Sequence, residues 1–157
     1  MKRLFALAVA VLFAGCSVDN SDTSTTQHIL TEPVTDQYNL TVHPGDYMYA
    51  TPAEITAYYE QTMACLGMTA DGPEVYYKSF KEYYNGVLGG WGFHTGGVIY
   101  INTDDPVTGA TRDASTDREV LKHEFIHHIL NAVTGDGSND HGSPYFAQCG
   151  LGVSVNN

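Results

Sequence analysis

The residues best suited to chemistry in this chain are two histidines and a glutamate in close spacing. His123, Glu124 and His127 form an H-E-x-x-H pattern inside an apolar, helix-forming run from Glu119 to Val133. On a helix, residues four apart lie on one face, separated by about 6 Å. Both imidazoles can then reach one metal ion, and zinc accepts imidazole nitrogens at about 2.0–2.1 Å. Glu124 would flank the ion and take a proton from a water molecule.

Local signals predict that this run is a buried helix. Thr116 followed by Glu119 is a capping-box pattern. Buried imidazoles without partners are costly, and a metal ion would satisfy them. The alternative is a pair of core histidines satisfied by hydrogen bonds. Apolar residues occupy most sides of the helix: Val120, Leu121, Phe125, Ile126, Ile129, Leu130 and Val133.

The stretch from His123 to His127 resembles the active-site helix of the zincin metallopeptidases. The resemblance implies a small α+β domain, with a short mixed sheet packed on a backing helix and a buried active-site helix. It also implies Zn²⁺ as cofactor, a peptide or protein substrate, and Glu124 as general base. Neither the gluzincin nor the metzincin pattern is complete. No glutamate follows Glu124, and Leu130 and Val133 stand where metzincins have glycine and histidine.

A catalytic zinc site needs a third protein ligand and keeps one position for water. Candidates lie in the segment from Gly135 to Pro144, where glycines allow the chain to turn back after the helix. His141 is the first candidate, Asp140 the second and Asp136 the third.

Three further residues have possible roles near such a site. His128 lies about 100° around the helix from His127, so we expect it to be packed or to support a ligand. His94 lies in a glycine-rich stretch and could approach the metal. Tyr145 is a candidate for stabilising an oxyanion, as a Tyr or His does in zincins; the alternative is an ordinary packed tyrosine.

The remaining elements are expected from local patterns. Thr51, Pro52 and Glu54 predict the start of a helix that backs the sheet, and Gly67 predicts its end. A short helix is expected after Ser143. Strands are expected at 34–42, 74–80 and 98–102, with a hairpin or loop at 88–97.

The strongest strand pattern comprises Val98, Ile99, Tyr100, Ile101 and Asn102. In zincins, an edge strand before the active-site helix pairs with the extended substrate, and backbone hydrogen bonds supply the affinity. The resemblance therefore makes this stretch the candidate substrate strand. The alternative is an interior strand.

The start of the chain is expected to direct export. Lys2 and Arg3 precede an apolar run, Leu4 to Ala14, which is too short to span a bilayer. The run ends in Gly15-Cys16, which resembles a bacterial lipobox and implies lipidation of Cys16. Signal cleavage with release is the alternative. A residue other than Asp after the cysteine suggests the outer membrane. The expected organisation is a signal peptide at 1–15, an acylated cysteine and flexible tether at 16–27, and one domain at 28–157.

Charge and cysteines limit the partners. The chain carries a net charge of −11, which argues against nucleic acid and leaves a lipid anchor as the expected link to a membrane. Cys65 and Cys149 are expected to form a disulfide in an exported protein. Two buried thiols are the alternative.

Two other functions fit the same residues. A non-catalytic zinc-binding surface lipoprotein would need a fourth protein ligand, such as Asp140 together with His141. A structural lipoprotein with an accidental H-E-x-x-H pattern would bind no stoichiometric metal.

Overall fold

The structure is a computed structural model that describes residues 30–45, 48–80, 90–104, 114–136 and 143–149. The expected signal peptide, the lipidation site Cys16 and the tether lie outside these residues. Among the described residues, no helix combines the length and the apolar character needed to cross a membrane.

The centre of the fold is a mixed five-stranded sheet with the order β1-β2-β3-β5-β4. β2, β3 and β5 are parallel, and β1 and β4 pair antiparallel at the two edges. The α+β class expected from the sequence is therefore confirmed. The strands are β1 (Val34–Thr35), β2 (Thr41–Val42), β3 (Glu74–Lys78), β4 (Gly92–Thr95) and β5 (Val98–Asn102).

The first expected strand, 34–42, is wrong as a single element. Asn39 has a φ of 61°, and Asp36 Oδ1 accepts hydrogen bonds from the backbone N–H groups of Tyr38 and Leu40. This turn folds the segment into the antiparallel pair β1 and β2. The glycine-rich stretch contributes β4, which forms a hairpin with β5 through Gly96 and Gly97, as expected.

The prediction that residues 98–102 form an edge strand is wrong. β5 lies inside the sheet, because it pairs with β3 on one side and with β4 on the other. Its backbone groups are therefore used within the sheet. The edge strand that precedes the long helix is β4.

Helix α1 (Pro52–Leu66) begins and ends where the sequence predicts. Thr51 and Glu54 make a reciprocal capping box, which contributes about 1 kcal/mol to helix stability. Gly67 ends the helix in the left-handed conformation, with a φ of 63°.

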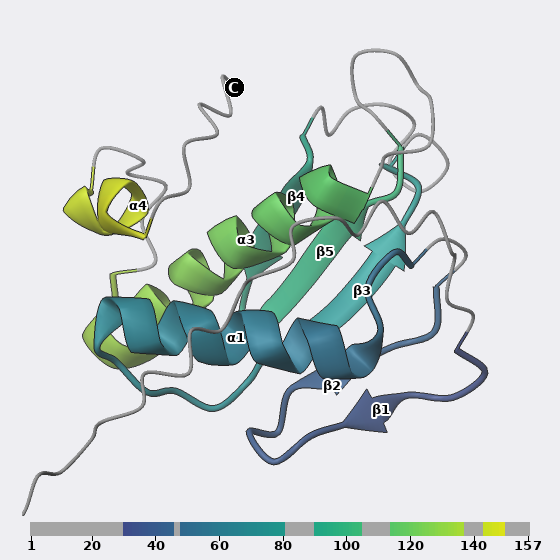
Figure 1. Ribbon diagram of the computed structural model, residues 1–157, viewed down its shortest axis with the longest axis horizontal. Helices are drawn as coiled ribbons and strands as arrows, with labels where there is room; N and C mark the ends of the chain where they lie inside the picture. The colour runs from purple at the N-terminus through teal and green to yellow at the C-terminus, as the bar shows by residue number, and fades with distance from the viewer. Residues whose placement is uncertain (1–29, 46–47, 81–89, 105–113, 137–142, 150–157) are drawn as a thin grey trace, which may run out of the picture.

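Helix α3 (Ala114–Thr134) carries the H-E-x-x-H residues and begins two residues before the expected cap at Thr116. Asp117 in its first turn is buried and accepts a hydrogen bond of 2.9 Å from the Tyr77 hydroxyl, which ties the start of α3 to β3. Figure 1 shows α1 and α3 side by side over the sheet, with α3 next to β4 and β5.

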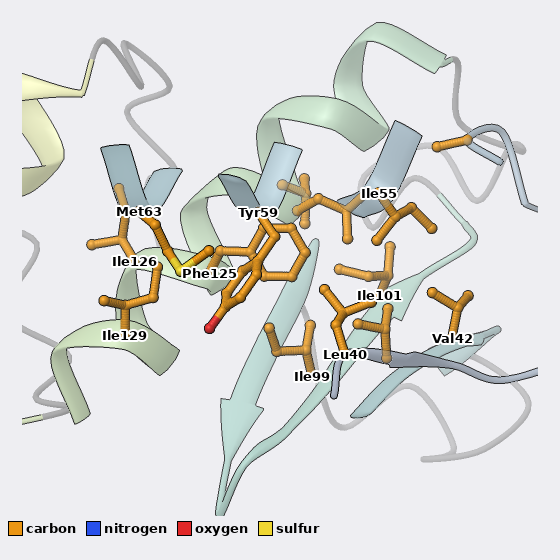
Figure 2. Packing of buried hydrophobic residues seen from close by; sticks show 14 of the residues in the cluster. Leu40, Val42, Ile55, Tyr59, Met63, Ile99, Ile101, Phe125, Ile126 and Ile129 are labelled. Carbon is orange, nitrogen blue, oxygen red and sulfur yellow. The ribbon is translucent and has the colours of Figure 1, made fainter. Parts of the chain in front are cut away.

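The hydrophobic core lies between the two helices and the sheet. Tyr59 of α1 packs against Phe125 of α3, with ring centroids 5.0 Å apart. Figure 2 shows this pair near Ile99 and Ile101 of β5. These side chains are almost completely buried. The apolar face of α3 therefore packs in the core, and this packing fixes the rotation of the helix about its axis.

The C-terminal described element is α4 (Pro144–Gln148), a short helix that follows Ser143 as expected. Cys65 at the end of α1 forms a disulfide with Cys149, which confirms the expected pairing. Gln148 also donates a hydrogen bond to the Cys65 carbonyl. The disulfide therefore fixes α4 beside the helical layer (Figure 1).

Candidate metal centre

The H-E-x-x-H residues are brought together as their spacing predicts. His123 and His127 lie one turn apart on α3, and their Nε2 atoms are 3.2 Å apart. Two nitrogens bound to one tetrahedral zinc ion at 2.0–2.1 Å would be about 3.3–3.4 Å apart. The histidine pair therefore fits a zinc ion without rearrangement of the helix.

A hydrogen bond between the two neutral rings would give a similar separation. The ring planes are tilted by 75° with centroids 4.9 Å apart, so the rings approach by their edges and do not stack. His127 is 5 % exposed and His123 is half-buried. The pair is thus shielded at His127 and partly exposed at His123.

Glu124 is buried next to this pair. The side chain is only 5 % exposed, and burial raises the pKa of Glu124 to about 8. A bound cation nearby would favour the ionised carboxylate and oppose this shift. The carboxyl group faces β4, since a methyl group added at Gly92 would lie 3.1 Å from Glu124 Oε1. Glu124 is therefore held between α3 and the edge strand.

Helix α4 closes the other side of the histidine pair. The Phe146 ring is buried, and its centroid lies 5.0 Å from that of His123 and 4.8 Å from that of His127. Nothing in the local sequence signalled this contact, because it depends on the long-range disulfide that fixes α4. Tyr145 is partly buried and packs against the core, and its role at an oxyanion stays a prediction.

Of the three candidate third ligands between Gly135 and Pro144, the structure describes Asp136 alone. The first two candidates, His141 and Asp140, lie outside the described residues. Asp136 is exposed at the end of α3, where its backbone N–H donates to the Thr134 hydroxyl. No group of three or more His, Cys, Asp or Glu residues that could hold a metal ion occurs in the described part of the chain.

A second histidine pair, not predicted from the sequence, joins β4 to α3. His128 Nδ1 lies 3.2 Å from His94 Nε2, and His128 Nε2 lies 2.8 Å from the carbonyl oxygen of Asp71. The carbonyl can only accept, so His128 Nε2 carries the proton and its Nδ1 accepts from His94 Nε2–H. His128 is thus packed, as expected, and His94 binds to it instead of approaching the first pair.

Burial keeps this second pair neutral. It lowers the pKa of His94 to about 4, with a smaller contribution from the neighbouring His128, and it also lowers the pKa of His128. Both rings are satisfied by hydrogen bonds, so their role in the described structure is to connect the edge strand to the helix.

The resemblance to zincins therefore stays a prediction from the sequence of one helix, His123 to His127. The chain matches no model of a known protein family, no curated protein sequence and no solved structure.

Proposed function

We propose that this chain is a zinc-dependent endopeptidase in which His123 and His127 hold the metal and Glu124 is the general base. The observation that carries the proposal is the 3.2 Å separation of the two Nε2 atoms beside a buried carboxyl group. Buried carboxyl groups with raised pKa values are typical of acid–base sites. His141 is the third ligand in this proposal, with Asp140 as second choice.

Zinc, when bound, would polarise the scissile carbonyl and acidify a water molecule. Glu124 takes a proton from that water molecule as it attacks the carbonyl carbon. It then gives the proton to the leaving amine as the C–N bond breaks. The low exposure of Glu124 supports both steps, because it keeps bulk water away from the carboxyl group that receives and returns the proton.

The substrate strand in this proposal is β4 instead of β5. Within the described residues, β4 pairs only with β5, so its other edge is the one available for strand addition. A Cβ at Gly92 would lie 3.1 Å from Glu124 Oε1, and His94 lies 3.2 Å from His128, so β4 runs beside α3 at Glu124. An extended peptide paired with β4 would therefore lie close to Glu124 and bind through its backbone.

The direct test measures zinc content and cleavage of casein and a peptide library together. The proteins are the chain from Ser17 onward, its Glu124→Ala variant and its Glu119→Ala variant. Glu119 is a matched control, because it is a partly exposed glutamate on the same helix. We expect one zinc per chain in all three, with cleavage by the parent and Glu119→Ala. Glu124→Ala should lose 10²–10⁴-fold in activity.

The other outcomes separate the alternatives. One zinc in every protein with no cleavage by any would overturn the peptidase proposal in favour of a zinc-binding lipoprotein. Comparable cleavage by Glu124→Ala would overturn the role of Glu124. No stoichiometric zinc in the parent would make the H-E-x-x-H pattern an accident of sequence.

We also propose that the protein is exported and anchored in the outer membrane by a lipid on Cys16. The support is the sequence around Gly15 and Cys16 alone. Cys16→Ala in the full chain should move the protein from the membrane fraction to the soluble fraction. Unchanged membrane association would contradict the anchor.

A further inference from the structure

Gly92 lies on β4 at the point where the strand meets the buried face of α3. Its backbone does not require glycine, because Gly92 is not among the described residues with a positive φ. Glycine is also unfavourable inside a strand, where it packs no side chain. The reason for glycine here is therefore the space that a side chain would occupy.

That space is already filled by α3. A Cβ at Gly92 would lie 2.9 Å from Val120 Cγ1, 3.1 Å from Glu124 Cγ and 3.1 Å from Glu124 Oε1. The first distance is shorter than carbon atoms tolerate, and the other two are tight. β4 or Val120 would have to shift to relieve the first contact, and Glu124 would have to give by a few tenths of an ångström at the other two.

β4 is fixed in place by three sets of contacts. Its backbone pairs with β5 along its whole length. The hydrogen bond between His94 and His128 joins its other end to α3. The residues just before it are held by buried Asn102, whose Nδ2 donates to the Gly90 carbonyl and whose backbone N–H donates to the Trp91 carbonyl, both at 2.9 Å. The strand therefore cannot withdraw without breaking several bonds.

Val120 is a poor candidate to move as well. It is 6 % exposed and belongs to the core cluster, and its β-branched side chain has one strongly preferred rotamer on a helix. Glu124 has three side-chain torsions and reaches Gly92 with its end. An added methyl group would therefore strain its contact with Val120 and also displace the Glu124 carboxyl group by a few tenths of an ångström.

We propose that Gly92 is a positioning residue for Glu124. Because Gly92 has no side chain, the Glu124 carboxyl group can lie directly against the backbone of β4. From this position it reaches the reacting water. This inference rests on the proposed function, in which Glu124 is the general base. Displacements well below 1 Å are enough to slow such a reaction severalfold or more, since a misplacement of about 1 Å costs about 10²-fold.

The activity test compares Gly92→Ala with Gly90→Ala. The control adds the same methyl group two residues away, where, among the residues that the structure describes, it would meet the Gly92 carbonyl oxygen at an ordinary 3.5 Å. We expect kcat to fall about tenfold in Gly92→Ala, with KM and the zinc content unchanged. Gly90→Ala should keep the parent kcat. An unchanged kcat in Gly92→Ala, or an equal loss in both variants, would overturn the proposal.

A second measurement does not depend on activity. In a double-mutant cycle on the metal-free protein, Gly92→Ala is introduced into the parent and into the Glu124→Ala variant, and unfolding in urea is followed. Removal of the Glu124 side chain should relieve part of the strain. The factor by which Gly92→Ala raises the unfolding equilibrium constant should therefore be about ten times smaller in the Glu124→Ala background than in the parent. Equal effects in both backgrounds would overturn the contact on which the proposal stands.

The two measurements also separate the two proposals. An inactive parent with coupling between Gly92 and Glu124 would reject the peptidase function but support the positioning of the carboxyl group. An active parent without coupling would reject the role of Gly92 and leave the peptidase function in place.

Discussion

His123 and His127 lie one turn apart on α3 with their Nε2 atoms 3.2 Å apart, and His94 and His128 join β4 to α3 with ring nitrogens also 3.2 Å apart. The distance is the same, but the surroundings differ. The second pair ends in a hydrogen bond to the carbonyl of Asp71, which fixes its tautomers. The first pair faces Phe146 of α4. The separation of two histidine nitrogens alone therefore does not distinguish a metal site from a hydrogen-bonded pair; what sets the first pair apart is the buried carboxyl group of Glu124 beside it.

The largest expected effect is on zinc affinity, when each of the two adjacent histidines of α3 is replaced on its own. His127→Gln should lower zinc affinity roughly 1,000-fold, because about a third of a binding free energy on the order of 10–16 kcal/mol is lost with one ligand. His128→Gln should change zinc affinity less than about threefold. Competition with a chelator of known affinity measures both. A larger effect at His128 would reverse the assignment of the two pairs.

Loss of the disulfide should follow. Replacing Cys65 and Cys149 by serine removes a long-range cross-link and should cost about 3 kcal/mol of stability. Zinc affinity should also fall, because α4 carries Phe146 against His123 and His127. Urea unfolding and zinc competition test the two effects. An unchanged zinc affinity in the folded variant would show that α4 does not support the first pair.

The pH dependence of stability distinguishes Glu124 from an exposed carboxylate. In the metal-free protein, burial raises the pKa of Glu124 to about 8 from an ordinary 4.5. The folded state then holds a proton that the unfolded state releases, so stability falls as the pH rises from about 4.5 to about 8. Glu124→Gln should be more stable than the parent by on the order of 4 kcal/mol near pH 8.

Urea unfolding with a chelator present, from about pH 4 to about pH 8, measures this difference. The two proteins should have the same stability at the acidic end of the range, where the carboxyl group is protonated in both states. A constant difference at every pH would contradict a buried, protonated Glu124.

The smallest expected effect concerns the second pair. Burial lowers the pKa of His94 to about 4 and also lowers the pKa of His128. Because both folded pKa values lie below the ordinary 6.5, the contribution of the pair to stability is present above that pH and is lost as the pH falls. NMR titration of the histidine rings should show no protonation of His94 near pH 6.5. A normal titration there would contradict the hydrogen-bonded pair.

Elements with local signals could be predicted from the sequence. Thr51, Glu54 and Gly67 define α1 by contacts within a few residues, and the apolar run of α3 defines a buried helix. Residues 34–42 were predicted wrongly as one strand. Their alternating pattern does not reveal the left-handed turn at Asn39.

Features that depend on distant residues could not be predicted. The composition of β5 is compatible with an edge strand and with an interior strand. β5 is interior because β3 and β4 pair with it on its two sides. The partner of His128 lies 34 residues away, on β4. The contact between Phe146 and the metal-ligand candidates joins α4 to α3, and the Cys65–Cys149 disulfide that links α4 to α1 spans 84 residues. The spacing of His123, Glu124 and His127, in contrast, is set by one turn of helix.

The most direct test of the metal assignment is a zinc-edge anomalous difference map from crystals of the chain grown with one equivalent of zinc. The account predicts one peak, within about 2.0–2.1 Å of Nε2 of both His123 and His127, and none between His94 and His128. A peak at the second pair, or no peak at the first, would contradict it.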